Sequence, residues 1–441
     1  MKTDILIIGT GCSGLYAALQ MPKDKQILMI TKAGLEDSDS YLAQGGICVL
    51  KDDDDYDSYF EDTMKAGHYE NDRESVDIMI RSSGEVIKEL IDYGVEFQKD
   101  AEGQLSFTKE GAHSDKRILF HDDVTGKEIT SKLLARVQEL PNVTLLTHTT
   151  MVDIVEKDNI CYGAVIRTDK YEYETVEADF VILACGGIGG LYRHSTNFRH
   201  LKGDALAIAI KHGVELKDVN YVQIHPTTLY QKDDEARSFL ISESVRGEGA
   251  HLLDKNMQRF TDELQPRDVV TKAILAQMEK DGTDFVWEDL RPIPKEELLS
   301  HFPNIVEHCR QKGYDVTKEP IPVVPAQHYF MGGIKVDHVS KTSMDQLYAV
   351  GETACNGVHG RNRLASNSLL ESLVFAKRAA EDIQEHYDSV KKKPELFDYI
   401  NLDAYEENVH DMKANYRSSV LKEISESEKE NPTGVDAEKR Y

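Results

Sequence analysis

Three glycines near the start of the chain, Gly9, Gly11 and Gly14, have the G-x-G-x-x-G spacing of a phosphate-binding turn. In such a turn the first glycine permits a tight bend, the second lets the backbone approach a pyrophosphate, and the third lets a helix pack closely on a strand. The helix that follows presents free N–H groups and a partial positive charge to the phosphates. These residues therefore predict a dinucleotide site, with an ordinary glycine-rich turn as the alternative.

The elements needed to position this turn are present on both sides of it. The apolar run Ile5–Ile8 predicts a buried strand, and the Ala-rich run after Gly14 predicts a helix. The next predicted strand, 26–31, ends at Thr31 and Lys32, where an ordinary nucleotide fold places an acid for a ribose hydroxyl. This departure disfavours NAD and predicts a different ribose or phosphate contact.

Strand and helix patterns alternate along most of the chain, which is typical of a doubly wound, Rossmann-like α/β fold. Apolar residues at helical spacing predict helices, and apolar or alternating runs predict strands. The predicted helices are 74–93, 127–139 and 368–387, and the predicted strands are 143–146, 151–156, 160–167, 175–178 and a run from 180 into a second glycine-rich turn.

A change in composition and in predicted secondary structure indicates how the chain is divided into domains. Loops and short helices with many His and Arg residues predominate between 219 and 329, so we expect an inserted α+β capping domain there. The Rossmann-like domain then comprises 1–218 and 330–390. The Lys/Glu-rich tail, 391–441, is expected to form one or two short helices and to be disordered from about Ser425. The acidic run Asp52–Asp55 is expected to be a solvated loop.

Composition argues against several classes of function. The formal net charge of −26 disfavours nucleic acid and anionic membranes as partners. No apolar run reaches membrane-spanning length, and the chain enters its first strand without a signal peptide, so we expect a cytoplasmic protein. Six scattered cysteines without a C-x-x-C pair are typical of reduced thiols and give no metal site.

Ten short motifs, in order over residues 1–390, resemble those of the succinate dehydrogenase/fumarate reductase flavoprotein family. They are GTGCSG (9–14), YLAQGG (41–46), KEGAHS (109–114), ACGG (184–187), QIHPT (223–227), SESVRGEGA (242–250), PRD (266–268), PAQHYFMGGI (325–334), AVGE (349–352) and HGRNRLASNSLLE (359–371). One such match arises easily by chance, whereas ten in order do not. The resemblance implies an FAD-binding Rossmann-like domain with a cap, and a C-terminal helical region that is truncated here.

The resemblance also implies which residues contact FAD. The glycine turn would hold the pyrophosphate, Lys32 would lie at the adenosine end, and the segment from Asp39 would line the isoalloxazine ring. The ribityl chain and ring edges would be held by Asp204, Glu352, Ser368 and Leu369. The full implied set is Gly9, Thr10, Gly11, Cys12, Ser13, Gly14, Lys32, Asp39, Ser40, Tyr41, Leu42, Ala43, Gln44, Gly45, Gly46, Asp204, Glu352, Ser368 and Leu369. Asp39 stands where the succinate and fumarate enzymes carry a covalently flavinylated His, so we expect non-covalent FAD.

The substrate implied by the resemblance is a four-carbon dicarboxylate, bound over flavin N5 at the cap interface. Two carboxylates that leave water need charged donors at both ends, each charge-assisted hydrogen bond contributing about 1.5–3 kcal/mol. The implied catalytic residues are Arg267, Glu110, His225, His328 and Arg363, and the implied substrate-binding residues are Glu110, His225, Ser242, Glu243, His328 and Arg363. Ser242 replaces the Thr common in the family. Arg267 is assigned a charge-stabilising role, because a guanidinium keeps its proton.

Glu110 distinguishes between members of the family. The succinate and fumarate enzymes carry an uncharged residue at this position, whereas aspartate has an ammonium that a carboxylate would pair. We therefore expect FAD-dependent oxidation of L-aspartate to iminosuccinate by hydride transfer, with dioxygen or fumarate as acceptor. Family precedent places this reaction first in de novo NAD synthesis, with quinolinate synthase consuming the imine. The alternatives are a soluble fumarate reductase or succinate oxidase, and a non-enzymatic flavin sensor.

Overall fold

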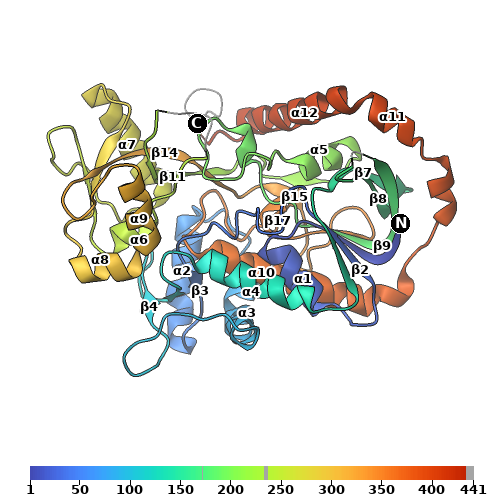
Figure 1. Ribbon diagram of the computed structural model, residues 1–441, viewed down its shortest axis with the longest axis horizontal. Coiled ribbons are helices and arrows are strands. Elements are labelled where there is room, and N and C mark those ends of the chain that lie inside the picture. Colours follow the sequence, from blue (N-terminus) through green and yellow to red (C-terminus); the bar gives the residue numbers. More distant parts are fainter. Residues whose placement is uncertain (171, 233–236, 434–441) are drawn as a thin grey trace.

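A mixed seven-stranded sheet forms the centre of the larger part of the molecule (Figure 1). The computed structural model describes residues 1–170, 172–232 and 237–433. The sheet has the order β6-β2-β1-β9-β8-β7, and β16 also pairs with β9. Its strands are β1 (Lys2–Ile8), β2 (Ile27–Ile30), β6 (Val143–Leu146), β7 (Thr150–Lys157), β8 (Ile160–Arg167), β9 (Tyr173–Leu183) and β16 (Leu347–Ala349).

The long strand β9 joins a parallel and an antiparallel half of this sheet. Its first residues pair antiparallel with β8, whereas its last residues lie between β1 and β16, parallel to both. The sequence predicted two separate strands here, from 175 and from 180, but the pairing is continuous from Tyr173 to Leu183. The parallel half brings the carboxyl ends of β1 and β9 together, which is where ligands bind in doubly wound sheets.

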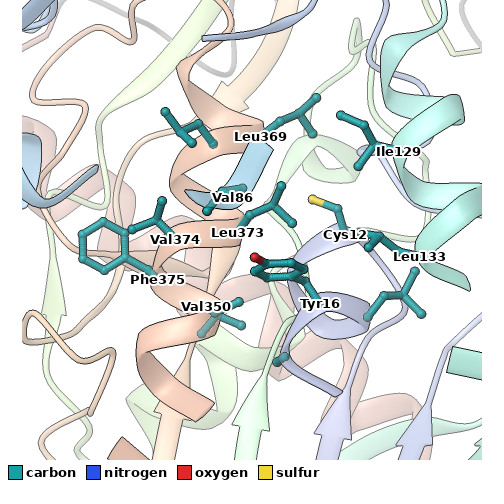
Figure 2. Close-up of a cluster of buried hydrophobic side chains, with 14 of the residues drawn as sticks. Cys12, Tyr16, Val86, Ile129, Leu133, Val350, Leu369, Leu373, Val374 and Phe375 are labelled. Atoms are coloured by element: carbon teal, nitrogen blue, oxygen red, sulfur yellow. The ribbon is translucent and has the colours of Figure 1, made fainter. Parts of the chain in front are cut away.

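Four helices cover one face of the sheet and form its largest hydrophobic cluster with it. They are α1 (Cys12–Gln20), α3 (Arg73–Asp92), α4 (Thr125–Gln138) and α10 (Asn367–His386). The last three lie close to their predicted ranges, whereas α1 begins at Cys12 and not after Gly14 as expected. Figure 2 shows Tyr16 of α1 beside Leu373 of α10, with Ile129 and Leu133 of α4 nearby. The opposite face carries α5 (Asp204–Lys211) and a second cluster that includes Ile8 and Leu183.

A second, four-stranded antiparallel sheet, here called the cap sheet, has the order β11-β14-β13-β12 and lies at one end of the molecule (Figure 1). Its hydrophobic cluster is separate from those of the large sheet. That separate core supports our proposal that 219–329 form a cap. The strands are β11 (Val222–Leu229), β12 (His251–Leu253), β13 (Val286–Asp289) and β14 (Ile321–Phe330), and the helices are α6 (Glu243–Gly247), α7 (Arg267–Asp281), α8 (Lys295–His301) and α9 (Pro303–Gln311).

Two small three-stranded sheets and α2 (Tyr56–Ala66) complete this part of the fold. One sheet has the order β3-β5-β4 and the other β10-β15-β17. Their strands are β3 (Ile47–Cys48), β4 (Phe107–Thr108), β5 (Ile118–Leu119), β10 (Leu216–Lys217), β15 (Gly333–Lys335) and β17 (Ala354–Cys355). The acidic run at 52–55 is not simply a solvated loop, because Asp55 is buried and forms an ion pair of 2.8 Å with the buried Arg117.

The C-terminal segment follows the surface back across the molecule as α11 (Leu402–Glu407) and α12 (Val409–Glu430) (Figure 1). Here the sequence-based expectation of disorder from Ser425 was wrong as far as Glu430, since α12 is regular to that residue and packs on α5. The remaining residues of that expectation, 434–441, lie outside the described part of the chain. Among the helices that the structure describes, none has both the length and the apolar character required to cross a bilayer.

Candidate active site

A cavity lies between the carboxyl ends of β1 and β9 and the cap sheet, and it collects most of the residues that the sequence analysis selected. Every expected catalytic and substrate-binding residue lines it, together with most of the expected FAD contacts. The expected FAD contacts that line it are Gly9, Thr10, Gly11, Cys12, Ser13, Lys32, Asp39, Ser40, Leu42, Ala43, Gln44, Gly45, Gly46, Asp204, Glu352, Ser368 and Leu369. Gly14 and Tyr41 are not among the lining residues.

The glycine turn after β1 has the backbone geometry that its spacing predicts. Gly9 has a φ of 121°, and a Cβ there would lie 2.0 Å from the carbonyl oxygen of Ala184. Gly14 acts behind the turn rather than at the cavity wall, because its Cβ would lie 2.3 Å from the Gly9 carbonyl oxygen. α1 begins after Gly11, which has no side chain to cap it, and the Cys12 N–H donates to Ser40 Oγ at 2.9 Å. Gly11, Cys12 and Ser13 line the cavity, so the N-terminus of α1 faces it, as an anion site requires.

Lys32 and Asp204 lie together at one end of the cavity. The Lys32 ammonium forms an ion pair with Asp204 and also donates to the His200 carbonyl oxygen at 2.9 Å. The resemblance had placed Lys32 at the adenosine end and Asp204 at the ribityl chain. The ion pair brings these two residues to the same end of the cavity, and their contacts with FAD remain predictions.

Two half-buried carboxyl groups, Asp39 and Glu352, face the cavity. Asp39 accepts a 2.9 Å hydrogen bond from the Phe198 backbone N–H, and Glu352 accepts one of 2.9 Å from Phe330. Burial raises the pKa of both groups. Within the described residues, Asp39 Oδ2 and Gln44 Oε1 are buried without a hydrogen-bond partner. A helix N-terminus and unpartnered polar atoms along one cavity fit a dinucleotide with a polar ring system such as FAD.

Glu110 is the carboxylate that the sequence analysis assigned to substrate recognition. It is 2% exposed, and its two oxygens accept hydrogen bonds from Ser244 at 2.8 Å and from Ser366 at 2.5 Å. Burial, and then the charge of Glu243, raise the pKa of Glu110. The side chain therefore faces the cavity and not bulk solvent. Gly45 lies against it, since a Cβ on Gly45 would be 2.7 Å from Glu110 Oε1.

The loop that carries Glu110 is held by a buried ion-pair cluster that the sequence analysis did not identify. Arg117 is bound by Asp55 and Asp62, and its Nη1 lies 3.1 Å from His113 Nδ1. The other ring nitrogen of His113 lies 3.0 Å from the Ala365 carbonyl oxygen. This chain of contacts joins the Glu110 loop to the segment that supplies Ser366. The acidic run at 52–55 was the available signal, but its partner lies 62 residues away in the sequence.

Arg267 begins α7, and its guanidinium is bound by two side chains, of which Glu243 lines the cavity. Its Nε donates to Glu243 at 2.5 Å, and its Nη1 donates to Gln223 Oε1 at 2.8 Å. Gln223 in turn donates to Asn362 Oδ1 and to the Arg363 carbonyl oxygen, both at 2.8 Å. Although burial alone would raise it, the charge of Arg267 holds the pKa of Glu243 below its usual value. Gln223 was present in the QIHPT motif and was missed, because only the neighbouring His was given a role.

His225 and His328 lie edge to face on adjacent strands of the cap sheet, with ring centroids 5.1 Å apart. Burial and the charge of Arg267 hold the pKa of both rings well below the usual value. Both histidines are therefore neutral at physiological pH, and the expectation that they act as charged donors is corrected. In the described structure His225 Nε2 is buried without a partner, while His328 Nδ1 lies 2.7 Å from Thr196 Oγ1.

Arg363 supplies the positive charge on the other side of the cavity. Its Nη1 donates to Ser368 at 2.7 Å, and its guanidinium lies 4.5 Å from the ring centroid of Tyr329. Burial, and then the charge of Arg267, lower the pKa of Arg363 to about 10, so it stays charged at neutral pH. Among the described residues its Nε is buried and unpartnered. Arg237, for which the sequence offered no signal, also lines the cavity.

Ser242 and Glu243 lie at the start of α6, where the sequence analysis expected a substrate-binding pair. Ser242 accepts a 3.2 Å hydrogen bond from the Ser244 backbone N–H, so its hydroxyl caps this short helix. Both residues line the cavity, but Glu243 is already bound to Arg267. Their roles toward a substrate remain predictions.

Comparisons with known proteins show which class of protein this chain belongs to. The family model described as FAD binding domain matches residues 4–369. The structure resembles a mutant of the E. coli quinol fumarate reductase subunit FrdA, with a TM-score of 0.84 and 29% identity, covering 90% of this chain and 72% of that one. Together with the cavity, these findings define an FAD-dependent flavoprotein enzyme.

Curated relatives narrow the class further. An L-aspartate oxidase from Clostridium perfringens is 49% identical over 402 residues, 91% of each chain. Another from Clostridium acetobutylicum is 46% identical over 392 residues, 89% of this chain and 90% of that one. The chain belongs to the L-aspartate oxidase family.

Proposed function

We propose that the protein oxidises L-aspartate to iminosuccinate, as the first step of de novo NAD synthesis. Bound FAD, held without a covalent bond, supplies the acceptor for the hydride from the substrate α-carbon, with dioxygen or fumarate as the final oxidant. The curated relatives named L-aspartate oxidase support the substrate, and the cavity supports a dicarboxylate. The labile imine would be consumed by quinolinate synthase, which is the proposed partner.

The protein's own side chains divide between the two ends of the substrate. Arg363, with its unpartnered Nε, and the neutral rings of His225 and His328 donate hydrogen bonds to the carboxylates. Arg267 keeps its proton and contributes positive charge near the reacting carbon, while Glu243 and Gln223 fix its orientation. Closing such groups around the substrate excludes water, which strengthens each charged contact.

Glu110 is the observation that carries the proposal. A carboxylate has about four acceptor sites, and the serines at 244 and 366 use two of them. A substrate ammonium can take a remaining site and neutralise a charge whose burial is otherwise unfavourable. Succinate and fumarate offer no cation, so a site built for them alone would have no use for this buried carboxylate.

Anaerobic mixing of the purified flavoprotein with L-aspartate, D-aspartate or succinate tests the proposal. Loss of the oxidised-flavin band near roughly 450 nm reports substrate oxidation without any assumption about the final acceptor. We expect L-aspartate to bleach the flavin far faster than D-aspartate or succinate. Bleaching by succinate alone would instead identify a succinate oxidase, and bleaching by none of the three would identify a flavin-binding sensor.

A further inference from the structure

The C-terminal helix α12 connects the two parts of the molecule. It lies along α5, and its end approaches the point where the chain enters β11 (Figure 1). Val420 of α12 is 1% exposed, in a hydrophobic cluster with Leu206 of α5, Val222 of β11 and Phe330 of β14. α12 therefore contributes to a hydrophobic cluster that also contains residues of α5 and of the two strands that lead into the cap sheet.

Polar contacts tie the last turn of α12 to Asn220, just before β11. Asn220 is 3% exposed, and its Nδ2 donates to Glu428 Oε2 at 3.0 Å and to the Asn431 carbonyl oxygen at 2.7 Å. Its Oδ1 accepts from Ser427 at 2.8 Å. Both ends of this buried amide are satisfied by the C-terminal segment alone, so the segment is specifically bound at this point.

The side chain of Asn431 extends the contact to a third part of the chain. Its Nδ2 donates to the Tyr221 hydroxyl at 2.6 Å, and its Oδ1 accepts from Arg361 Nη2 at 2.6 Å. Tyr221 and Arg361 both bind Glu70, and the Arg361 guanidinium lies 5.4 Å from the Tyr221 ring. Together with Asn220, these residues from distant parts of the sequence form one network.

This network lies directly behind the substrate-binding residues. Tyr221 precedes Gln223 by two positions, and its carbonyl oxygen accepts a 2.9 Å hydrogen bond from the Met331 N–H, where β14 leaves the cap sheet. Arg361 precedes Arg363 by two positions on the same loop. A movement of the network would therefore shift both connections to the cap sheet and the loop that presents Arg363.

We propose that the last turn of α12 is a latch, and that Asn220 and Asn431 are positioning residues for the substrate site. The latch, here meaning Ser427–Asn431 with its partners, holds the cap connections and the Arg363 loop in the arrangement that binds a dicarboxylate. This inference deepens the proposed function and rests on it for the identity of the substrate. When a latch is lost, the competent arrangement is less populated, and apparent affinity falls by that fraction.

Asn431→Ala and Asn220→Ala test the latch, with Glu430→Ala, at an exposed position of the same turn, as the control. Asn431→Ala removes two side-chain hydrogen bonds and Asn220→Ala removes three, which predicts an apparent KM for L-aspartate at least about 5-fold higher, with kcat almost unchanged. The control is expected to behave as wild type. A purely structural role would lower the thermal midpoint without changing KM, and that result would overturn the proposal.

A binding measurement separates the latch from the proposed function. Titration of the oxidised flavoprotein with succinate, followed by the change in its visible flavin spectrum, reports dicarboxylate affinity without turnover. Weaker succinate binding by both latch variants supports the latch whichever substrate is oxidised, and unchanged binding refutes it. Failure of L-aspartate to reduce the wild-type flavin would refute only the proposed substrate. The double variant is expected to weaken succinate binding by the same factor as either single variant, because both substitutions act on one network.

Discussion

At the scale of single residues, the site is a set of charges that partly neutralise one another. Arg267 is held by Glu243, whereas Arg363 has a hydroxyl and an aromatic ring as its contacts. The Glu110 carboxylate accepts hydrogen bonds from two hydroxyl groups, and no cation is among its contacts in the described part of the chain. The Glu110 carboxylate and the Arg363 guanidinium are therefore complementary to an amino dicarboxylate, which carries the opposite charges.

Replacing Glu110 by Gln should separate substrates that differ only in the amino group. The neutral amide leaves the ammonium of aspartate unpaired, which costs about 1–3 kcal/mol, so kcat/KM for L-aspartate should fall roughly 5- to 150-fold. Succinate affinity should change little, because succinate has no ammonium. Glu102→Gln, on an exposed loop, is the matched control. Equal losses for aspartate and succinate would contradict the pairing.

At the scale of elements, the cofactor site depends on how closely α1 approaches β1. The closest approach is at Gly14, which contacts the backbone of Gly9. Backbone atoms cannot turn away as a side chain does, so an added methyl group must move the helix itself. Because the N-terminus of α1 faces the cavity, such a movement also displaces the N–H groups expected to bind the pyrophosphate.

The Gly14→Ala variant should therefore bind FAD more weakly while it still folds. We expect the dissociation constant for FAD to rise at least about tenfold, equivalent to roughly 1.4 kcal/mol, measured by titration of the apoprotein. Gly84→Ala on α3 is the control, since its Cβ would have no atom within 4 Å. That variant should bind FAD normally and be more stable by about 0.5–1 kcal/mol, as expected for Gly to Ala in a helix. Normal FAD binding by Gly14→Ala would show that α1 can shift without affecting the site.

The elements themselves were largely predictable from the sequence. Helices α3, α4 and α10 were placed within about two residues of their observed ends, because their apolar residues recur at helical spacing and are buried in one cluster. The two parts of β9 were not joined, because the polar residues around Glu177 interrupt the apolar run. What connects them is pairing with β1 and β8, which no local pattern encodes.

At the scale of the whole molecule, two separately packed cores meet at the cavity. The cap core contains an unusual group, Glu288 on β13, which is 0% exposed. Within the described chain neither of its carboxylate oxygens has a hydrogen-bond partner. Burial raises the pKa of Glu288 to about 8, so it is mainly protonated at neutral pH. The stability of the cap should therefore depend on pH through this one group.

Replacing Glu288 by Gln should remove this group's contribution to the pH dependence of stability. In the unfolded chain Glu288 ionises near pH 4.5, whereas the folded protein keeps its proton up to about pH 8. The folded state thus binds more protons in this window, and the free energy of unfolding falls with rising pH by up to about 1.4 kcal/mol per pH unit relative to Glu288→Gln. Denaturant unfolding at several pH values measures the difference. Parallel profiles for wild type and variant would refute it, and Glu279→Gln, exposed on α7, is the control.

The sequence by itself determined the class of protein, the order of its main elements and most of the functional residues that line the cavity. It could do so because each motif is local. A turn, a helix face or a pair of neighbouring residues can be recognised from residue types and spacing within one short segment. Only the tertiary structure decided the pairing of Lys32 with Asp204, the neutral state of His225 and His328, and the route of α12 to Asn220. Those properties depend on burial and on charges brought close from distant positions, and both arise only when the chain has folded.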